Sequence, residues 1–286
     1  MGYTFGYEDS LRYRDWFRSE PGRTALAVEK ELLARLWAPS CPQRVLEVGC
    51  GTGVFSEWFA QQGHRVTGID PSPYMLQIAR SQLPWNIHFH KGCAEHLPFD
   101  DNAFDMVALI TTLEFVEDPV TALTEALRVA RRTVLLGVLN RYSLITLERW
   151  IEACWRPTVY RYARFFSIPD LRHMMEEILR GPVRLRWRTC LSLPLGALKY
   201  THRLERSRWM QWLPLGHFIG MRLDLTYPLQ TVQQPLFAEL PSAVGHGGLR
   251  SACWYSSFKK RSNSAGPRSQ AAYGDEGGPL WKGGGA

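Results

Sequence analysis

Residues Arg44 to Gly53 read Arg-Val-Leu-Glu-Val-Gly-Cys-Gly-Thr-Gly. The apolar residues at the start of this stretch predict a short buried strand over 44–48. Three alternating glycines follow, Gly49, Gly51 and Gly53. Glycine permits backbone conformations and a close ligand approach that a Cβ would block. A helix is expected over 54–62, and the unpaired N–H groups at a helix start can hold a polar or anionic part of a ligand. The stretch therefore predicts a strand that leads into a nucleotide-binding turn.

A second strand ends on an acidic residue. It is expected over 64–69, where an apolar run ends at Asp70 and Pro71 follows at once. An acidic residue at the end of the second strand can accept hydrogen bonds from ribose hydroxyls. The glycine spacing differs from the G-x-G-x-x-G pattern of dinucleotide-binding folds, because Gly53 comes one position early and Glu47 stands just before the turn.

Together with two further stretches, these residues resemble the class I S-adenosylmethionine-dependent methyltransferases, specifically the subgroup with the ubiquinone and menaquinone biosynthesis methyltransferases. The matching stretches, in the family's order and spacing, are Glu47-Val-Gly-Cys-Gly-Thr-Gly53, Gly68-Ile-Asp-Pro-Ser72 and Gly92-Cys-Ala-Glu-His-Leu-Pro-Phe-Asp-Asp-Asn-Ala-Phe-Asp105. The Arg-Asp-Trp-Phe of residues 14–17 resembles the family's lead-in segment, which covers the cofactor. The resemblance extends over about the first 225 residues.

The resemblance implies an α/β fold, a Rossmann-like doubly wound seven-stranded sheet that is mostly parallel with an antiparallel edge strand. Short apolar runs that alternate with helical patterns are typical of such a sheet. Strands are expected at 44–48, 64–69, 87–90, 104–110, 132–139, 183–191 and 216–222. Helices are expected at 24–37, 54–62, 73–81, 119–130, 144–154, 169–179 and 202–212. The expected domains are an N-terminal helical cap (1–43), a methyltransferase domain (44–225) and a C-terminal extension (226–286), in which the Gly-, Ser- and Pro-rich composition from about 262 predicts disorder.

The resemblance also implies S-adenosylmethionine as the cofactor. The glycine turn would face its methionine part, and Asp70 would hold the ribose diol. Cys93 departs from the family, which usually has an Asp there to accept from the adenine amino group, whereas the Ala94 N–H can still donate to a ring nitrogen. Met75 either packs on the adenine or belongs to the core of an amphipathic helix. The predicted cofactor-binding residues are Glu47, Gly49, Cys50, Gly51, Gly53, Asp70, Pro71, Met75, Cys93, Ala94, Glu95 and Thr111.

Methyl transfer chiefly needs a nucleophile held in line with the sulfonium, at about 3 to 3.5 Å and away from water, so few side chains are obligatory. Ligands of open α/β sheets bind at the carboxyl ends of the strands. Glu114, after the fourth strand, is the candidate acid or base, with local capping or pairing as the alternative. The predicted acceptor contacts are Tyr13, Trp16, Asn140, Arg141 and Tyr142. No metal site is predicted.

Composition limits the class of protein. A chain of 286 residues with 45% hydrophobic content suits one sizeable core. We find no apolar run long enough to cross a membrane and no signal-peptide pattern, so a cytoplasmic location is expected. The six cysteines are scattered without C-x-x-C spacing, so neither a disulfide framework nor a structural zinc is expected.

The net charge of +7 is unevenly distributed. Residues 1–140 carry 13 Lys and Arg against 17 Asp and Glu, whereas residues 141–286 carry 21 against 10. In folds of the family that this chain resembles, the segment after the fifth strand and the insertions near the sixth and seventh form the acceptor side, so the basic excess is expected there. Its arginines alternate with aromatic residues, a pattern that can bind RNA, an anionic and partly apolar small molecule or an anionic membrane surface, or that can simply be solvated.

The preferred hypothesis is methyl transfer to a small lipophilic or anionic metabolite, such as a quinone precursor. The alternatives are an RNA methyltransferase, a cofactor-binding protein without transfer activity and an NAD-dependent oxidoreductase. The RNA alternative is not favoured, because the chain has no Asn-Pro-Pro-aromatic signature and no appended RNA-binding module. The sequence does not predict the oligomeric state.

Overall fold

The structure, a computed structural model, describes residues 2–83, 86–148, 159–193, 204–205, 207 and 209–225. The chain divides into two compact units, Met1–Leu229 and Gln230–Ala286, and every described residue belongs to the first. The expected C-terminal extension, the expected helix at 144–154 from residue 149 onward and residues 202, 203, 206 and 208 of the expected helix at 202–212 lie outside the described residues. Within the described part of that last helix, a 3₁₀ helix forms over Met210–Trp212.

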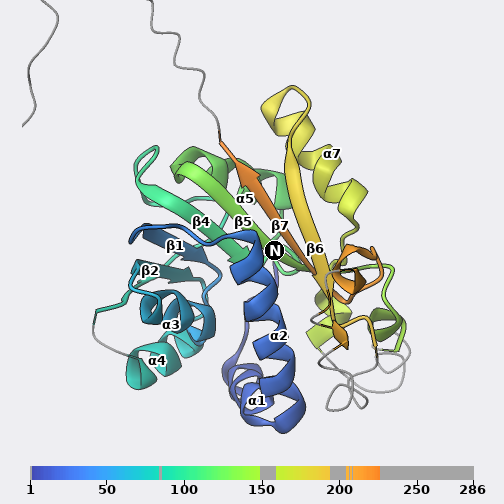
Figure 1. The fold of residues 1–286 in the computed structure, drawn as a ribbon. Coiled ribbons are helices and arrows are strands. Elements are labelled where there is room, and N and C mark those ends of the chain that lie inside the picture. The colour runs from blue at the N-terminus through green and yellow to red at the C-terminus, as the bar shows by residue number, and fades with distance from the viewer. Residues whose placement is uncertain are drawn as a thin grey trace, which may run out of the picture. The chain divides into compact units, whose positions relative to one another are not determined.

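Seven strands form one sheet in the order β3-β2-β1-β4-β5-β7-β6 (Figure 1). The strands are β1 (Arg44–Val48), β2 (Arg65–Asp70), β3 (His88–Lys91), β4 (Phe104–Ile110), β5 (Ala130–Leu139), β6 (Leu185–Cys190) and β7 (Phe218–Asp224). The first five strands pair in parallel, and β7 lies antiparallel between β5 and the edge strand β6. The predicted fold class is confirmed. Since β1 pairs with β2 on one side and β4 on the other, the carboxyl ends of β1 and β4 mark the switch point where open α/β sheets bind ligands.

Helices cover both faces of this sheet. They are α1 (Tyr7–Arg18), α2 (Glu20–Leu36), α3 (Val54–Gln61), α4 (Pro73–Gln82), α5 (Pro119–Val129) and α7 (Ile168–Leu179), with the short 3₁₀ helices η1 (Val159–Tyr162) and η3 (Met210–Trp212). Helices α2 and α3 share a core with one face of the sheet, and α5 and α7 share a core with the other. The central strands are therefore buried on both sides, as is typical of parallel sheets.

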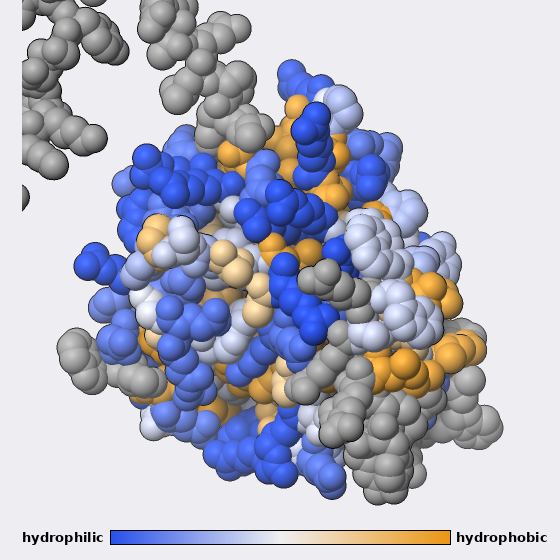
Figure 2. Space-filling view, in the orientation of Figure 1, coloured by the Kyte–Doolittle hydropathy of each residue, from blue (hydrophilic) through white to orange (hydrophobic). Residues whose placement is uncertain are grey.

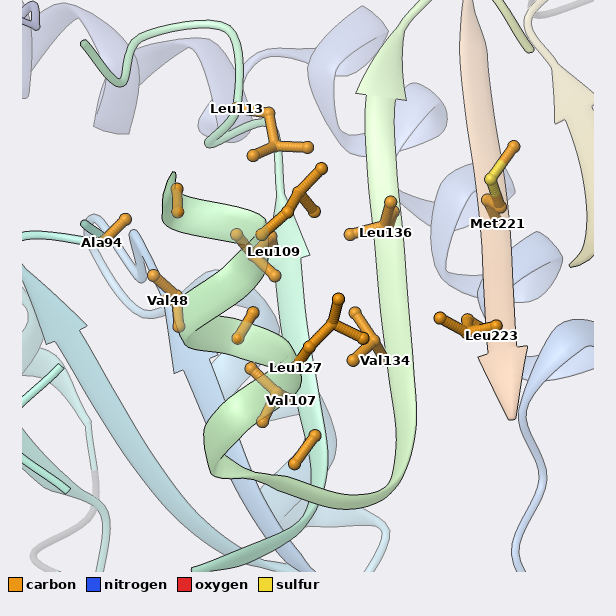
Figure 3. Close-up of a cluster of buried hydrophobic side chains, with 14 of the residues drawn as sticks. Val48, Ala94, Val107, Leu109, Leu113, Leu127, Val134, Leu136, Met221 and Leu223 are labelled. Carbon is orange, nitrogen blue, oxygen red and sulfur yellow. The ribbon is translucent and has the colours of Figure 1, made fainter. Parts of the chain in front are cut away.

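Successive residues of β4 show how the sheet separates the two cores. Val107 and Leu109 pack beneath α5, next to Leu127 and Leu136 (Figure 3). Their neighbours in sequence belong to the core on the α2 side: Met106, Ala108 and Ile110. Both cores close against β1 and β4, so the strands that lead into the glycine turn and the loop after β4 have a rigid base.

Most strand and helix ends differ from the sequence prediction by one or two residues, and larger or telling differences occur in α1, α2 and β7. Helix α1 was not among the expected helices, because its sequence is mostly polar and its one fully buried residue is Ser10. Helix α2 begins at Glu20 rather than 24, since the Ser19 side chain accepts a hydrogen bond from the Gly22 N–H and so caps an earlier first turn. Strand β7 extends to Asp224 rather than 222, because it pairs with β5 as far back as Thr133.

Candidate functional site

A cavity of about 840 Å³ lies at the carboxyl ends of the parallel strands. Its wall includes the N-terminal residues 2–5, parts of α1 and α2, and the loops after β1, β2, β3 and β4. The predicted site residues that line it are Tyr13, Trp16, Gly49, Gly51, Asp70, Pro71, Met75, Cys93, Ala94, Glu95 and Thr111. The predicted site residues outside the lining are Glu47, Cys50, Gly53, Glu114, Asn140, Arg141 and Tyr142. The structure therefore brings together most of the predicted cofactor side and two of the five predicted acceptor contacts.

The turn after β1 requires glycine. Gly49 has φ +70°, and a Cβ there would lie 2.4 Å from Cγ2 of Thr112. Gly51 also has a positive φ, +53°, and its N–H donates to Oδ2 of Asp70 at 2.8 Å. A larger residue at 49 would thus meet both backbone strain and a fixed neighbour. The backbone of this turn stays exposed to the cavity as a result.

Asp70 ends β2 with its carboxylate in the cavity wall. Oδ2 accepts from the Gly51 N–H, and Oδ1 accepts from the Ser72 N–H at 2.8 Å. Burial raises the pKa of the Asp70 carboxyl, whereas the two backbone hydrogen bonds act in the opposite direction. An ionised carboxylate offers about four lone-pair positions, so roughly two remain after these bonds. The residue therefore fixes the glycine turn and still has acceptor capacity for two hydroxyl groups.

The start of α4 connects this wall to the N-terminal segment. Ser72 caps the helix by accepting from the Met75 N–H at 3.2 Å, and its hydroxyl donates to the Phe5 carbonyl at 2.7 Å. Met75 is 3% exposed and lines the cavity. The position of Met75 agrees with both interpretations, since the side chain belongs to α4 and also faces the cavity.

Three predicted cofactor residues support the turn from behind. Glu47 is buried and accepts a hydrogen bond from the Ser56 hydroxyl of α3, and burial raises the pKa of its carboxyl to about 8. Burial also raises the pKa of the Cys50 thiol, which disfavours a reactive thiolate there. Gly53 is the left-handed N-cap of α3, where a Cβ would lie 2.4 Å from Cδ1 of Leu83.

The loop after β3 forms a further part of the cavity wall. Cys93, Ala94 and Glu95 all line the cavity. Among the residues that the structure describes, none accepts a hydrogen bond from the Ala94 N–H. The Glu95 carboxylate accepts from the Glu117 N–H at 2.9 Å and so ties this loop to the loop after β4. The Ala94 amide therefore remains available as a donor to a ring nitrogen.

Aromatic side chains from the N-terminus cover the cavity. Phe5 makes edge contacts with Tyr13 and with Phe115, at centroid distances of 5.9 and 5.1 Å. Tyr13 also contacts Phe17 at 4.9 Å, and burial raises the pKa of its hydroxyl. The predicted contacts Tyr13 and Trp16 thus belong to an apolar cover that suits an aromatic or aliphatic ligand.

Four residues from separate elements form what we call the inner wall: Glu29, Leu139, Leu191 and His217. Burial raises the pKa of the Glu29 carboxyl to about 8. Sequence reasoning missed Glu29 and His217. A signal for Glu29 exists, because it interrupts the apolar stripe of α2 formed by Ala25, Leu32 and Leu36. His217 carries no such signal, since it is a single residue before the last strand.

Asn140 lies just outside the lining with its side chain fully engaged. Its Nδ2 donates to the carbonyls of Pro214 and Gly216, both at 2.8 Å, and its Oδ1 accepts from the Tyr142 N–H at 3.0 Å. Arg141 instead pairs with Asp170 at 3.5 Å on the surface, and Tyr142 is 64% exposed. The geometry of Asn140 therefore fits a positioning role for the segment before β7.

Glu114 is also outside the lining. It is 1% exposed, and Oε1 accepts from the Leu139 N–H at 2.6 Å. Its Oε2 has no hydrogen-bond partner among the described residues, and burial raises the pKa of the carboxyl to about 8. This geometry fits the local-pairing alternative, because Glu114 fastens the loop after β4 to the end of β5. Its role as an acid or base stays a prediction.

Comparisons with known proteins agree with this architecture. A family model described as "Methyltransferase domain" matches residues 46–136. A ubiquinone biosynthesis O-methyltransferase of Haemophilus ducreyi is 30% identical over 168 residues, covering 56% of this chain and 69% of the relative. An uncharacterised methyltransferase of Mycobacterium tuberculosis is 37% identical over 100 residues, 35% of this chain and 40% of the relative. The chain thus spans about two fifths of the length of that curated relative.

A crystal structure from Thermotoga maritima is similar over most of the described fold. It is described as a SAM-dependent methyltransferase and possible histamine N-methyltransferase. The two chains are 26% identical with a TM-score of 0.60, and the match covers 77% of this chain and 98% of the other. The glycine turn and Asp70 both fall within the residues that the family model matches.

Proposed function

We propose a specific reaction for this chain, which belongs to the class I S-adenosylmethionine-dependent methyltransferase family. S-Adenosylmethionine is the cofactor of that family. The reaction is transfer of its methyl group to a small lipophilic metabolite, such as a quinone precursor. One observation carries the proposal: the glycine turn and Asp70 face the same cavity as the aromatic cover that Tyr13 and Trp16 belong to.

The residues of the cavity fit the cofactor. We propose that the backbone of Gly49 and Gly51 faces the methionine part, that Asp70 accepts from the ribose diol and that the Ala94 N–H donates to the adenine ring. The approximately two acceptor positions left on the Asp70 carboxylate match the two hydroxyls of a diol. When bound, the cofactor supplies an electrophilic methyl carbon, and its sulfur keeps the electron pair of the broken carbon–sulfur bond as the acceptor forms the new one.

The charges of the cavity support a neutral acceptor over an anionic one. The Asp, Glu, Lys and Arg side chains of the lining are mostly acidic even without Glu29, whose raised pKa of about 8 keeps it mainly neutral: Asp9, Asp70, Glu95, Glu117 and Asp118, against Arg12. An anionic acceptor would meet like charge on entering. Aromatic rings, by contrast, favour an apolar or aromatic molecule. We therefore propose a neutral lipophilic acceptor in place of the anionic one that the basic half of the sequence suggested.

The arginines that suggested RNA binding lie elsewhere. Among the described residues from 159 to 193, no arginine lines the cavity. Arg188 stacks over the Trp212 ring at 3.8 Å, and Arg186 pairs with Asp224 at 3.8 Å. On the face shown in Figure 2, hydrophilic residues dominate over α1 to α4, and apolar ones gather towards β6. In the described part of the chain, no helix is both long and apolar enough to cross a membrane.

Calorimetric titration with S-adenosylhomocysteine, with NAD as the control ligand, tests the cofactor part of the proposal. We expect one-to-one binding in the micromolar range or tighter for the former alone, a typical affinity for a cofactor. An absence of heat in folded protein would favour a protein without transfer activity. Heat with NAD alone would favour the oxidoreductase alternative.

Methyl-labelled cofactor then tests the acceptor. The protein is incubated with the organic-soluble fraction, the aqueous metabolites and the RNA of a cell extract, each with and without ribonuclease. We expect label in the organic-soluble fraction that ribonuclease leaves unchanged. Ribonuclease-sensitive label would instead support the RNA alternative.

A further inference from the structure

We propose that Glu29 selects the acceptor, because its carboxyl donates a hydrogen bond to a carbonyl or hydroxyl oxygen of a neutral molecule in the cavity. The inference rests on the proposed function and gives the acceptor one required group. It comes from the helix face that carries Glu29, from the strands beneath that face and from the hydrogen bonds of the other carboxyl groups in the cavity wall.

Glu29 lies on the buried face of α2. Residues three or four apart share one face of a helix, so Glu29 stands between Ala25 and the pair Leu32 and Leu33. These three neighbours are 4%, 0% and 0% exposed. Glu29 is less completely buried than they are, and it lines the cavity. The face of α2 that packs on the sheet therefore opens to the cavity at Glu29.

This face covers the part of the sheet that lies away from the predicted cofactor residues. A Cβ on Gly220 of β7 would lie 2.3 Å from Cδ2 of Leu32, so α2 packs directly on β7. The other residues of the inner wall come from the ends of β5 and β6 and from just before β7. Gly49, Asp70 and Ala94 instead follow β1, β2 and β3, which lie on the other side of β4. Glu29 therefore lies where an acceptor, rather than the cofactor, is expected.

The Glu29 carboxyl has no partner in the described part of the chain, where no hydrogen bond or salt bridge involves it. Other carboxylates of the cavity wall are engaged, since Asp70 accepts from two backbone N–H groups and Glu95 accepts from one. Those two side chains fasten loops. A polar group in an apolar surrounding costs free energy unless it finds a partner, so a ligand in the cavity is the partner that Glu29 can gain.

The protonation of Glu29 decides which group it recognises. Burial raises the pKa of its carboxyl to about 8, although the Lys30 ammonium acts in the opposite direction. At neutral pH the side chain is therefore mainly a carboxylic acid with one O–H to donate. A carbonyl or hydroxyl oxygen accepts that hydrogen bond and leaves the proton where it is. An ammonium group would instead need the carboxyl to lose its proton.

Other charged and titratable side chains surround the same space. They are Asp9, Arg12 and Tyr13 of α1, Lys30 of α2, Cys190 of β6 and His217 just before β7. Burial raises the pKa of the Cys190 thiol, and burial, Glu47 and Glu29 all raise the pKa of the Tyr13 hydroxyl, so both stay protonated while Glu29 titrates. Glu47 and Lys30 also have shifted pKa values. A variant of Glu29 leaves both of these residues in place, so it isolates the titration of Glu29.

Three probes with one bicyclic framework test the proposal. Tetralone carries a carbonyl oxygen, tetralin carries no polar group and aminotetralin carries an ammonium group. Each probe is titrated calorimetrically, near neutral pH, into protein saturated with S-adenosylhomocysteine. In Glu29→Leu, which replaces the carboxyl by an apolar side chain, we expect the affinity for tetralone to fall about tenfold. The affinities for tetralin and for S-adenosylhomocysteine should change by no more than about twofold.

Glu29→Gln separates the carboxylic acid from a carboxylate. The amide is always neutral and donates from the same place, so the affinity for tetralone near neutral pH should stay within about twofold. In the unchanged protein this affinity should fall about tenfold for each pH unit above about 8, as the carboxyl loses its proton. Glu29→Gln should show no such fall. These two pH profiles keep the proposal testable if Glu29→Leu does not fold, and a fall that persists in Glu29→Gln would contradict it.

Glu31→Leu is the matched control. Glu31 belongs to the same helix but lies outside the cavity lining, and its carboxylate pairs with Arg35 at 2.7 Å. We expect the affinity of this variant for tetralone to stay within about twofold of that of the unchanged protein. Failure of tetralone to bind the unchanged protein, retention of its affinity in Glu29→Leu or an equal loss in Glu31→Leu would each overturn the proposal.

Two further results would assign Glu29 a different ligand. Tighter binding of aminotetralin than of tetralone, lost in Glu29→Gln, would mean that Glu29 recognises a cation. A loss of S-adenosylhomocysteine affinity in Glu29→Leu as large as the loss for tetralone would move Glu29 to the cofactor site. Either result overturns the proposal. If the unchanged protein does not bind S-adenosylhomocysteine at all, the proposed function fails instead, and titrations with tetralone alone still test Glu29.

Discussion

The two ends of the cavity are built in different ways. At the cofactor end, backbone groups of the turn that contains Gly49 and Gly51 converge with one carboxylate, Asp70. At the inner wall, single side chains come from parts of the chain far apart in sequence, Glu29 from α2 and His217 from the residue just before β7. A ligand held by backbone groups is recognised through the conformation of the chain, which many substitutions leave unchanged. A ligand held by side chains is recognised differently whenever one of those side chains is replaced. The cofactor end is thus suited to one fixed ligand. The inner wall is suited to acceptors that differ from one relative to another, because substitutions there can change specificity. Substitutions at each end can test this division.

The largest effect is expected from Gly49→Ala. The new Cβ would lie 2.4 Å from Thr112 at a φ of +70°, so strain and overpacking should lower the free energy of unfolding by about 3 kcal/mol and abolish binding of S-adenosylhomocysteine. Urea unfolding and calorimetric titration measure the two quantities. Gly63→Ala is the matched control, because Gly63 has φ +86° with nothing within 4 Å. Equal losses of affinity in both variants would contradict a special role of Gly49, because Gly63 has a left-handed backbone but no crowded neighbour.

Asp70→Ala should act mainly on cofactor binding. We expect binding of S-adenosylhomocysteine to weaken by about 1 to 3 kcal/mol, since charge-assisted hydrogen bonds to the ribose and to the turn are lost. Asp105→Ala removes another carboxylate that accepts from a backbone N–H, that of Arg44 at 3.0 Å, but lies outside the cavity lining. Unchanged affinity in Asp70→Ala would sink its assignment to the diol.

Trp16→Ala should act mainly on the acceptor. Loss of an aromatic ring from the cavity wall is expected to raise the KM for a lipophilic acceptor about tenfold, or about 1.4 kcal/mol. The affinity for S-adenosylhomocysteine should change by no more than about twofold. Steady-state kinetics with the acceptor and titration with S-adenosylhomocysteine separate the two effects. A variant that loses cofactor affinity but keeps its KM for the acceptor would reverse the assignment of the cavity's ends.

Glu114→Gln tests the contact that fastens the loop after β4 to the end of β5. Its effect on the free energy of unfolding is expected to depend on pH. The folded pKa of about 8 lies above the ordinary 4.5 of a glutamate, so the folded state holds this proton more tightly than the unfolded chain does. Its contribution to stability is complete below about pH 4.5 and is lost as the pH rises towards 8. We therefore expect the variant to gain about 1 kcal/mol or more relative to the unchanged protein between pH 5 and pH 9. Parallel pH curves of the free energy of unfolding would contradict a buried proton on Glu114.

The smallest effect is a gain. Cys93 lines the cavity, at the position where the resemblance implies an acceptor for the adenine amino group. Cys93→Asp should strengthen binding of S-adenosylhomocysteine about fivefold, or about 1 kcal/mol, by supplying that acceptor. Titration of the variant with adenosine as a second ligand shows whether the gain comes from the adenine. A gain with S-adenosylhomocysteine but none with adenosine would argue against this position for the ring.

Local pattern decided how much of this molecule could be predicted from sequence. The bounds of β1 and β4 were predicted to the residue, and Gly49 and Asp70 do line the cavity, because a strand, a turn and a strand end are each written in consecutive residues. Helix α1 was not predicted because its sequence is mostly polar and only Ser10 is fully buried. The position of His217 in the cavity wall could not be predicted, because its contacts with Ser143 and Thr146 join residues some seventy positions apart in the sequence.

The predicted acceptor contacts show what a position at a strand end does not reveal about a side chain. Position at the end of β5 suggested that Asn140 would face a ligand, and the structure instead shows its amide engaged with the carbonyls of Pro214 and Gly216. Whether a polar side chain at a strand end faces a ligand or the backbone depends on what the connecting segment leaves unpaired. That information lies in the tertiary structure and not in the residue type.

The N-terminal segment is also expected to influence how fast a bound molecule leaves the cavity. Residues 2–5 line the cavity. The hydrogen bonds that hold them there include those from the Ser72 hydroxyl to the Phe5 carbonyl, from the Tyr3 N–H to the Phe115 carbonyl and from the Tyr3 hydroxyl to the Asp9 carboxylate. Such short attachments open far more readily than a core does. A molecule inside can exchange with the solution through that opening, so the dwell time of the product is expected to follow the fraying of this segment. Opening of residues 2–5, rather than methyl transfer itself, would then limit the rate of turnover.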